Sequence, residues 1–251
     1  MEKSEQATQT PVVIEVWADL GCPWCYVGKH RLQRAIEERP DAERFELKIR
    51  SFELNPDAPK EPESIEAVFL RTHGGDAEGV MRAERRVQAL AGSEGLAFDL
   101  DRLNANTFDL HRVMHYAEEA GKGLEFFSRL QDRFFAGEID PYDADTMASV
   151  AESLGLSGSR VREVLAGDEY ADAVRADVAE GAALGARGVP FAVFGRRFGA
   201  SGAQSVEGYR RALDAVVEAV DAPGATGAPG ANGATDAPGT NGAPGATGAT
   251  G

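Results

Sequence analysis

Cysteine is scarce in this sequence, because its 251 residues include only Cys22 and Cys25. Two cysteines in a chain of this length do not make a disulfide-stabilised scaffold. Long apolar runs are also missing, since no stretch approaches the roughly 18–20 residues of a membrane-spanning helix. The polar segment Met1–Thr10 lacks the apolar core of a secretory signal peptide. We therefore expect no membrane partner and a cytoplasmic location.

Positive charge is in deficit. The 26 lysines and arginines are outnumbered by 41 aspartates and glutamates, which gives a formal net charge of −15. Such a surface repels nucleic-acid phosphates and anionic lipids. The charge balance predicts no nucleic-acid partner and indicates a surface that favours solubility.

The first 50 residues predict a strand, a helix and a second strand. Pro11–Trp17 is a dense apolar run typical of a central strand covered on both faces. Cys22–Arg39 has helical spacing, and Pro23 fits the first helical turn. Phe45–Ile49 alternates apolar and charged residues, as a strand does. We expect the two strands to be parallel, with a right-handed crossover.

Most of the remaining chain has helical periodicity. Residues Glu63–Arg187 are predicted as nearly all helix, with glycine, asparagine and proline between the amphipathic stretches. Strand character returns at Phe191–Phe194, and a turn to Phe198–Ala200 predicts a hairpin. A last amphipathic helix is expected at Ser205–Val220. The chain is therefore an α/β protein.

This order of elements predicts a single sheet domain with an insertion. We assign residues 11–62 and 187–220 to the sheet domain and residues 63–186 to an inserted helical domain. In the remaining segment, 221–251, glycine recurs every third residue from Gly224, except at Asp236. A collagen-like helix needs that period, but this run is short and interrupted. We therefore predict a flexible tail.

The sequence Cys22-Pro23-Trp24-Cys25 follows a predicted strand and opens a predicted helix. Residues three apart lie on one helical face, so their thiols can form a reversible disulfide with little adjustment. Helix N-termini favour thiolates, and thiols there can have a pKa of ~3.5–7.5 instead of about 8.5. We expect Cys22, at the exposed end, to attack substrates, and Cys25 to resolve the mixed disulfide.

A metal site is the weaker interpretation of these cysteines. A structural zinc site needs about four ligands, and only two cysteines are present. His30 points away from their shared face, and His111 and His115 lack the glutamate that follows the first histidine of a metalloprotease helix. We predict no metal.

Gly188-Val189-Pro190 precedes the strand expected at Phe191. Proline is ordinary at the first position of a strand. Because only about 5–6% of bonds before proline are cis, local physics predicts a trans Val189–Pro190 bond.

With these residues in hand, the chain resembles the DsbA-like thioredoxin family. It looks closest to the cytoplasmic FrnE-like branch, which borders the 2-hydroxychromene-2-carboxylate isomerases. The resemblance covers roughly residues 11 to 220 and is carried by several stretches together. These are Asp19–Gly28, Phe52–Pro56, Asn106-Thr107 with His111-Arg112, Gly188–Phe191 and Ser201–Gln204.

The resemblance implies a thioredoxin-like fold with an inserted all-helical domain. It also implies that Cys22 is the nucleophile, that Cys25 resolves, and that Val189–Pro190 is cis and faces them. The residue before such a proline offers backbone groups to an extended substrate. The predicted substrate-binding residues are Pro23, Trp24, Val189, Pro190, Asn55 and His111.

Some of these roles stay open. Asn55 and His111 can line a cleft or simply pack a loop and a helix. Two alternatives are likewise open for Trp24 and Tyr26, which can form a rim that contacts the substrate or fill the core.

The preferred function is disulfide exchange with protein dithiols or disulfides, or with a small thiol as cosubstrate. No cofactor is expected besides the Cys22–Cys25 disulfide. The direction of exchange and the oligomeric state stay open. The alternatives are a thiol-dependent isomerase of small aromatic substrates, which uses a glutathione-type thiol, and a non-catalytic peptide-binding or chaperone module.

Overall fold

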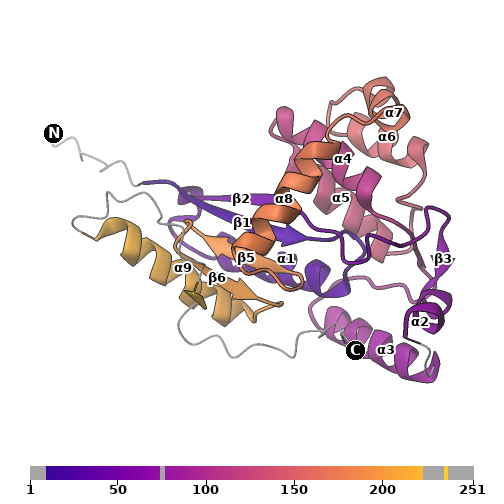
Figure 1. Ribbon diagram of the computed structural model, residues 1–251. Helices are drawn as coiled ribbons and strands as arrows, with labels where there is room; N and C mark the ends of the chain where they lie inside the picture. The colour runs from indigo at the N-terminus through magenta and orange to yellow at the C-terminus, as the bar shows by residue number, and fades with distance from the viewer. Residues whose placement is uncertain (1–9, 74–76, 223–234, 237–251) are drawn as a thin grey trace.

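The computed structural model describes residues 10–73, 77–222 and 235–236, which form a sheet with helices on both faces (Figure 1). Five strands are arranged in the order β2-β1-β5-β6-β7. Strands β1 and β2 are parallel, whereas β5 is antiparallel to β1 and to β6. The parallel pair and the hairpin match the sequence-based prediction. The strands are β1 (Val12–Ala18), β2 (Phe45–Ser51), β5 (Phe191–Phe194), β6 (Phe198–Ser201) and β7 (Thr235–Asp236).

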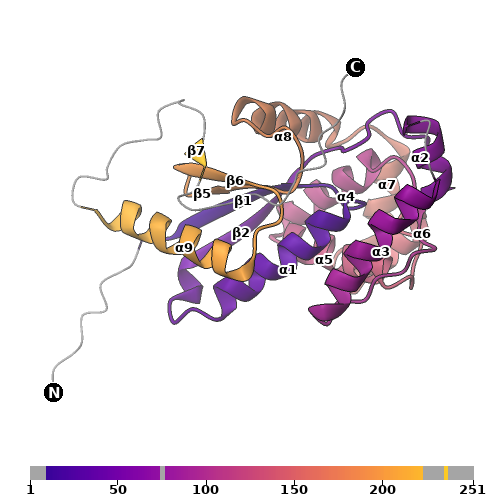
Figure 2. The same cartoon turned by 90° about the horizontal axis from the view of Figure 1, so that it is seen from below.

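Helices α1 (Pro23–Glu37) and α9 (Val206–Asp221) pack together on one face of the sheet, and α8 (Ala171–Ala183) covers the other (Figure 2). Strand β1 lies between β2 and β5, so its side chains alternate between these two layers. Ile14 enters the main core, whereas Trp17 packs in a smaller core with Phe191 and Val193 on the α8 side. The dense apolar run is thus a central strand, as predicted.

A helical lobe lies beyond the end of the sheet at which β1 terminates (Figure 1). It also contains a short antiparallel ladder between β3 (Glu63–Ser64) and β4 (Leu103–Asn104). Two-residue strands are too short to show periodicity, so the sequence did not predict them. In the described ranges, no helix is both long enough and apolar enough to cross a membrane. The lobe helices are α2 (Ile65–His73), α3 (Ala77–Ser93), α4 (Phe108–Glu119), α5 (Gly123–Phe135), α6 (Ala144–Glu152) and α7 (Gly158–Ala166).

The main core is continuous from the sheet into the lobe. Val16 and Leu32 belong to the same cluster of buried side chains as Phe134 and Met147 of the lobe. This shared core fixes the lobe beside the start of α1. Helix α8 falls within the predicted insert but contacts β1 and β2, and the predicted domain limits stay a prediction.

Little of the predicted tail is described. Helix α9 ends at Asp221, and Thr235–Asp236 pairs in parallel with Phe198 and Gly199 of β6. The rest of the prediction for 221–251, and the prediction for most of Met1–Thr10, lie outside the described residues.

Candidate active site

The site begins in the loop between the end of β1 and the start of α1. Cys22 is the N-cap residue of α1, with an extended backbone (φ −80°, ψ 116°), and Pro23 follows as the first helical residue. The Cys22 carbonyl accepts the N–H of Tyr26 over 3.1 Å, and its own N–H donates to the carbonyl of Asp19 over 3.2 Å. The free N–H groups and the positive dipole end of α1 therefore lie at the Cys22 end.

The two cysteines are free thiols that lie close to each other. Burial, followed by the hydrogen bond with Cys22 and the charge of Cys22, raises the pKa of the Cys25 thiol well above its ordinary value. We expected Cys22 to be exposed, but it is only 3% exposed, and Cys25 is 1% exposed. The carbonyl of Val189 lies 3.8 Å from the Cys22 sulfur and accounts for part of this cover.

The Val189–Pro190 peptide bond is cis. The trans bond expected from base rates is therefore wrong, and the cis bond implied by the family resemblance is confirmed. Pro190 packs against α1 at Gly28, where a Cβ would lie 3.1 Å from Pro190 Cγ and 3.3 Å from Tyr209 Oη. Glycine at this position lets the helix approach the proline closely. This contact holds the Val189 carbonyl beside Cys22.

Asp19 anchors the loop that carries Cys22. Its Oδ1 accepts the N–H of Gly21 over 3.3 Å, and its Oδ2 accepts the N–H of Leu54 over 2.6 Å. Gln131 of α5 donates its side-chain N–H to the carbonyls of Asp19 (3.5 Å) and Leu20 (3.1 Å). The cysteine loop is thus tied to the loop after β2 and to the helical lobe.

Two titratable side chains complete what we call the Asp19 cluster, defined as Asp19, Glu53, His111 and Gln131. His111 of α4 is buried, and its Nε2 lies 3.8 Å from Oδ1 of Asp19. Burial raises the pKa of Glu53, with the charge of Asp19 adding to the effect and His111 opposing it. In the described chain, this cluster included, no group of three or more His, Cys, Asp and Glu side chains has an arrangement that could hold a metal ion.

The other predicted site residues are placed as follows. Tyr26 is buried and stacks on Phe135 with ring centroids 4.5 Å apart, so it fills the core. Trp24 is half-buried and packs against the same core. Asn55 is half-buried in the loop after β2, beside Leu54, which is 53% exposed. The structure therefore brings Cys22, Cys25 and Val189–Pro190 into contact, and His111 joins them through Asp19.

Sequence reasoning assigned no role to Asp19, Glu53 or Gln131. One signal was available for Gln131, because it lies four residues after Phe127 and so shares the apolar face of α5. A polar residue on such a face needs a buried partner. Asp19 and Glu53 carry no local signal, since the groups that they meet are remote in sequence.

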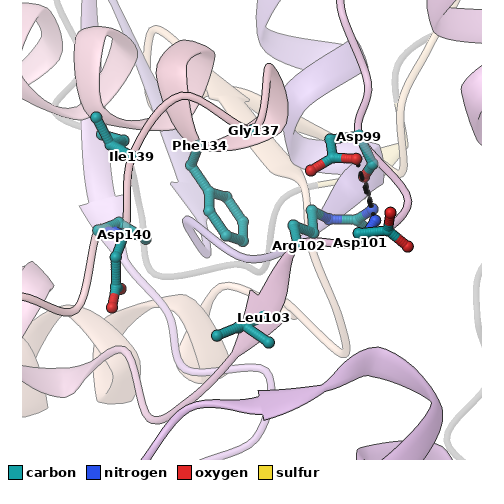
Figure 3. A pocket seen from close by; sticks show the side chains of 9 residues that line it. Asp99, Asp101, Arg102, Leu103, Phe134, Gly137, Ile139 and Asp140 are labelled. Carbon is teal, nitrogen blue, oxygen red and sulfur yellow. Dashed lines mark hydrogen bonds between the residues drawn. The ribbon is translucent and has the colours of Figure 1, made fainter.

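A hollow of about 160 Å³ opens on the lobe near this site (Figure 3). In the close-up, the Phe134 ring stands above Leu103, with the Arg102 side chain beside them. The neighbouring residue Asn104 links the hollow to the cysteine loop, because a Cβ on Gly21 would lie 3.3 Å from its Oδ1. The hollow is lined by Asp99, Asp101, Arg102, Leu103, Phe134, Gly137, Ile139, Asp140 and Pro141.

Paired cysteines at a helix N-terminus, opposite a cis-proline on a mixed sheet, define the class of thioredoxin-like thiol oxidoreductases. The model of the DSBA-like thioredoxin domain family matches residues 13–214. The chain belongs to this family, as predicted.

Individual proteins are also similar to this chain in sequence or in structure. A Streptomyces coelicolor protein described as a probable DsbA oxidoreductase is 39% identical, with a TM-score of 0.76, over 82% of this chain and 89% of its own. Bacillus subtilis YwbO is 26% identical over 65% of this chain and 76% of its own length. A 2-hydroxychromene-2-carboxylate isomerase, 14% identical with a TM-score of 0.58 over 76% of this chain and 88% of its own, shares the fold.

Proposed function

We propose that the protein is a thiol–disulfide oxidoreductase that exchanges disulfides through Cys22 and Cys25. One observation carries the proposal: two free thiols lie close together in the first turn of α1, beside the cis Val189–Pro190 bond. Membership of a family of thiol oxidoreductases supports the same chemistry.

In the reductive direction, the Cys22 thiolate attacks one sulfur of a substrate disulfide. A disulfide forms between Cys22 and the substrate, the substrate S–S bond breaks, and the departing thiolate takes up a proton. Cys25 then loses its proton and attacks the Cys22 sulfur, which releases the second substrate thiolate for protonation. The substrate gains two electrons and two protons, and an external dithiol returns the Cys22–Cys25 disulfide to thiols. The same steps in reverse oxidise a substrate dithiol.

The substrate contacts follow from what surrounds Cys22. Pro23, Trp24 and Val189 are half-buried beside it, so each keeps some surface for contact. An extended peptide can pair with the backbone at Val189, next to the reacting sulfur, in the manner of an added strand. This geometry suits protein dithiols or disulfides, and a small thiol fits the same position. Asn55 is half-buried on the loop that Asp19 anchors and provides a further contact.

We further propose a cytoplasmic location and the division into a sheet domain (11–62 and 187–220) and a helical insert (63–186). In a reducing compartment, a pair with a potential near −270 mV, at the thioredoxin end of the scale, acts as a reductant. A pair near about −120 mV acts as an oxidant. Thiol trapping of the wild-type protein in defined redox buffers decides between these directions.

An aromatic disulfide that releases coloured nitrothiobenzoate tests the mechanism. The reduced wild type should release two equivalents, one for each step, whereas Cys25→Ser should release one and keep a mixed disulfide on Cys22. Cys22→Ser should lose the fast first release. Wild-type kinetics in Cys22→Ser would overturn the proposal. Turnover of a chromene substrate by a Cys22→Ser/Cys25→Ser variant would establish the isomerase alternative instead.

A further inference from the structure

His111 is an unusual histidine for a packed helix. Its residue is 1% exposed, and neither ring nitrogen has a hydrogen-bond partner among the described residues. Most buried polar side-chain atoms in proteins are hydrogen-bonded, so a buried exception calls for an explanation. The charged group next to it is Asp19, whose Oδ1 lies 3.8 Å from His111 Nε2.

Asp19 connects His111 to the reacting pair. Its carbonyl accepts the N–H of Cys22, which places the carboxylate one short loop away from the thiols. After burial and the neighbouring Cys22, two parts of Asp19 act on the pKa of the Cys25 thiol: a backbone hydrogen bond lowers it, and the charge of the carboxylate raises it. Tyr142, from the loop before α6, also faces Asp19 and stays neutral, because burial and the Asp19 charge raise its pKa. A negative charge on Asp19 therefore opposes proton loss from Cys25.

The remaining charged groups near His111 are few. Glu53, from the loop after β2, is close enough for His111 to oppose the rise in its pKa, and Arg175 of α8 acts on Glu53 in the same direction. On α4 itself, Arg112 is paired with Asp109 and donates to carbonyls near α7. His115, one turn along α4, contacts Ser51 and Asp177 instead.

We propose that His111 is a positioning residue whose protonation sets the net charge that the Asp19 cluster presents to Cys25, and thereby makes the resolving step depend on pH. The inference rests on the proposed disulfide exchange. An imidazolium beside Asp19 offsets the carboxylate, so Cys25 loses its proton more readily for the attack on Cys22. A neutral imidazole leaves the charge of Asp19 uncompensated.

The resolving step can be timed directly as the second phase of nitrothiobenzoate release. We expect His111→Gln to slow this phase by roughly three- to tenfold at about pH 5.5, as for a charge interaction of up to one pKa unit. The ratio of the two rates should fall towards one as the pH rises, because a neutral imidazole no longer offsets the charge of Asp19. His115→Gln is the matched control, because it removes a half-buried histidine from the same helix without touching Asp19. Its rate profile should follow the wild type.

Asp19→Asn provides an independent test, also in case His111→Gln folds poorly. Removal of the carboxylate should speed the second phase most at high pH and least at low pH, which is the opposite trend. In the Asp19→Asn background, His111→Gln should have no further pH-dependent effect. The inference would be overturned if the ratio of the wild-type and His111→Gln second-phase rates stayed constant from about pH 5 to 9. It would also be overturned if the effect of Asp19→Asn on this rate did not vary with pH. If the wild type released no second equivalent at all, the proposed function itself would fail.

Discussion

The molecule contains two buried polar clusters, and they differ in how completely their groups are paired. Under α8, the Asp177 network (Glu15, Arg50, His115 and Asp177) is fully connected. Asp177 accepts the N–H of Ser51 over 2.9 Å and pairs with Arg50 and His115 at 3.1 Å each. Glu15 pairs with Arg50 at 2.6 Å and also with Arg196.

At the cysteine end of the sheet, the Asp19 cluster leaves atoms without partners. Both ring nitrogens of His111 and the side-chain oxygen of Gln131 lack a hydrogen bond within the part of the chain that the structure describes. A fully paired buried cluster stabilises the fold, because the loss of one member leaves unpaired charges in the interior. A partly paired cluster keeps groups available to respond to a reaction. The comparison therefore separates a stabilising cluster from one that serves the thiols.

The largest expected effect comes from the thiols themselves. Cys25→Ser removes the resolving nucleophile, so the mixed disulfide on Cys22 should persist. Insulin reduction should fall by at least about a hundredfold, equivalent to about 2.7 kcal/mol in the activation barrier. Mass spectrometry should find the substrate adduct on Cys25→Ser and none on Cys22→Ser. Wild-type turnover in Cys25→Ser would show that another group resolves the intermediate.

Asp177→Ala should break the paired cluster. It removes the acceptor shared by the Ser51 N–H, His115 and one Arg50 N–H, while Arg50 keeps its pairing with Glu15. We therefore expect a loss of about 3 kcal/mol in the free energy of unfolding, measured with urea. The rate of disulfide exchange by the folded protein should change by less than about twofold, since Asp177 serves the stabilising cluster.

A matched control lies on the same helix. Asp172 pairs with Arg175, but its side chain is 99% exposed, and Asp172→Ala should leave the unfolding midpoint unchanged. Equal destabilisation by the two variants would show that the Asp177 network does not stabilise the fold.

Features with a local signal could be predicted from the sequence. The apolar run of β1, the helical spacing after Cys22 and the alternation in β2 each report on neighbouring residues. The parallel pairing followed from the handedness of the crossover. The Cys22/Cys25 spacing likewise predicts both thiols on one helical turn, and the structure places them close together.

Features that depend on distant contacts could not be predicted in this way. Glu15 looks like an isolated charge in β1, and its partner Arg196 is 181 residues away. Asp19 meets Gln131 at a separation of 112 residues. The burial of Cys22 and the cis bond before Pro190 depend on loops that only the folded chain brings together. The family resemblance predicted the cis bond, because related sequences share the contacts between distant residues that determine it.

Gly28→Ala should have a moderate effect on the cysteine end of the sheet. Its new Cβ would lie 3.1 Å from Pro190 Cγ and 3.2 Å from the Ala203 side chain. Overpacking of about 1–3 kcal/mol should outweigh the gain of up to about 1 kcal/mol from the helix propensity of alanine. We expect a net loss of about 1 kcal/mol and slower exchange, because Pro190 must move. Gly92→Ala on α3, where a Cβ meets nothing within 4 Å, should instead be neutral or stabilising.

The smallest expected effects are opposite pH dependences of stability in the two clusters. Burial raises the pKa of Asp177, but hydrogen bonds from His115 and from the Ser51 N–H outweigh it, so the pKa of the folded protein lies below the ordinary value. An acid with a lowered pKa in the folded state adds stability at pH values above its unfolded pKa, and that stability is lost as the pH falls through the folded value. Asp177→Asn should therefore converge with the wild type below about pH 4 in urea-unfolding experiments.

The pKa of Glu53 shifts in the opposite direction on folding. Burial, reinforced by Asp19, raises its pKa in the folded protein, so folding is penalised once the pH rises through the window above the unfolded value of about 4.3. Glu53→Gln keeps the shape and removes the charge. It should be more stable than the wild type near neutral pH, and the difference should vanish below about pH 4. Stability differences of the same sign for Asp177→Asn and Glu53→Gln at neutral pH would contradict the contrast between the two clusters.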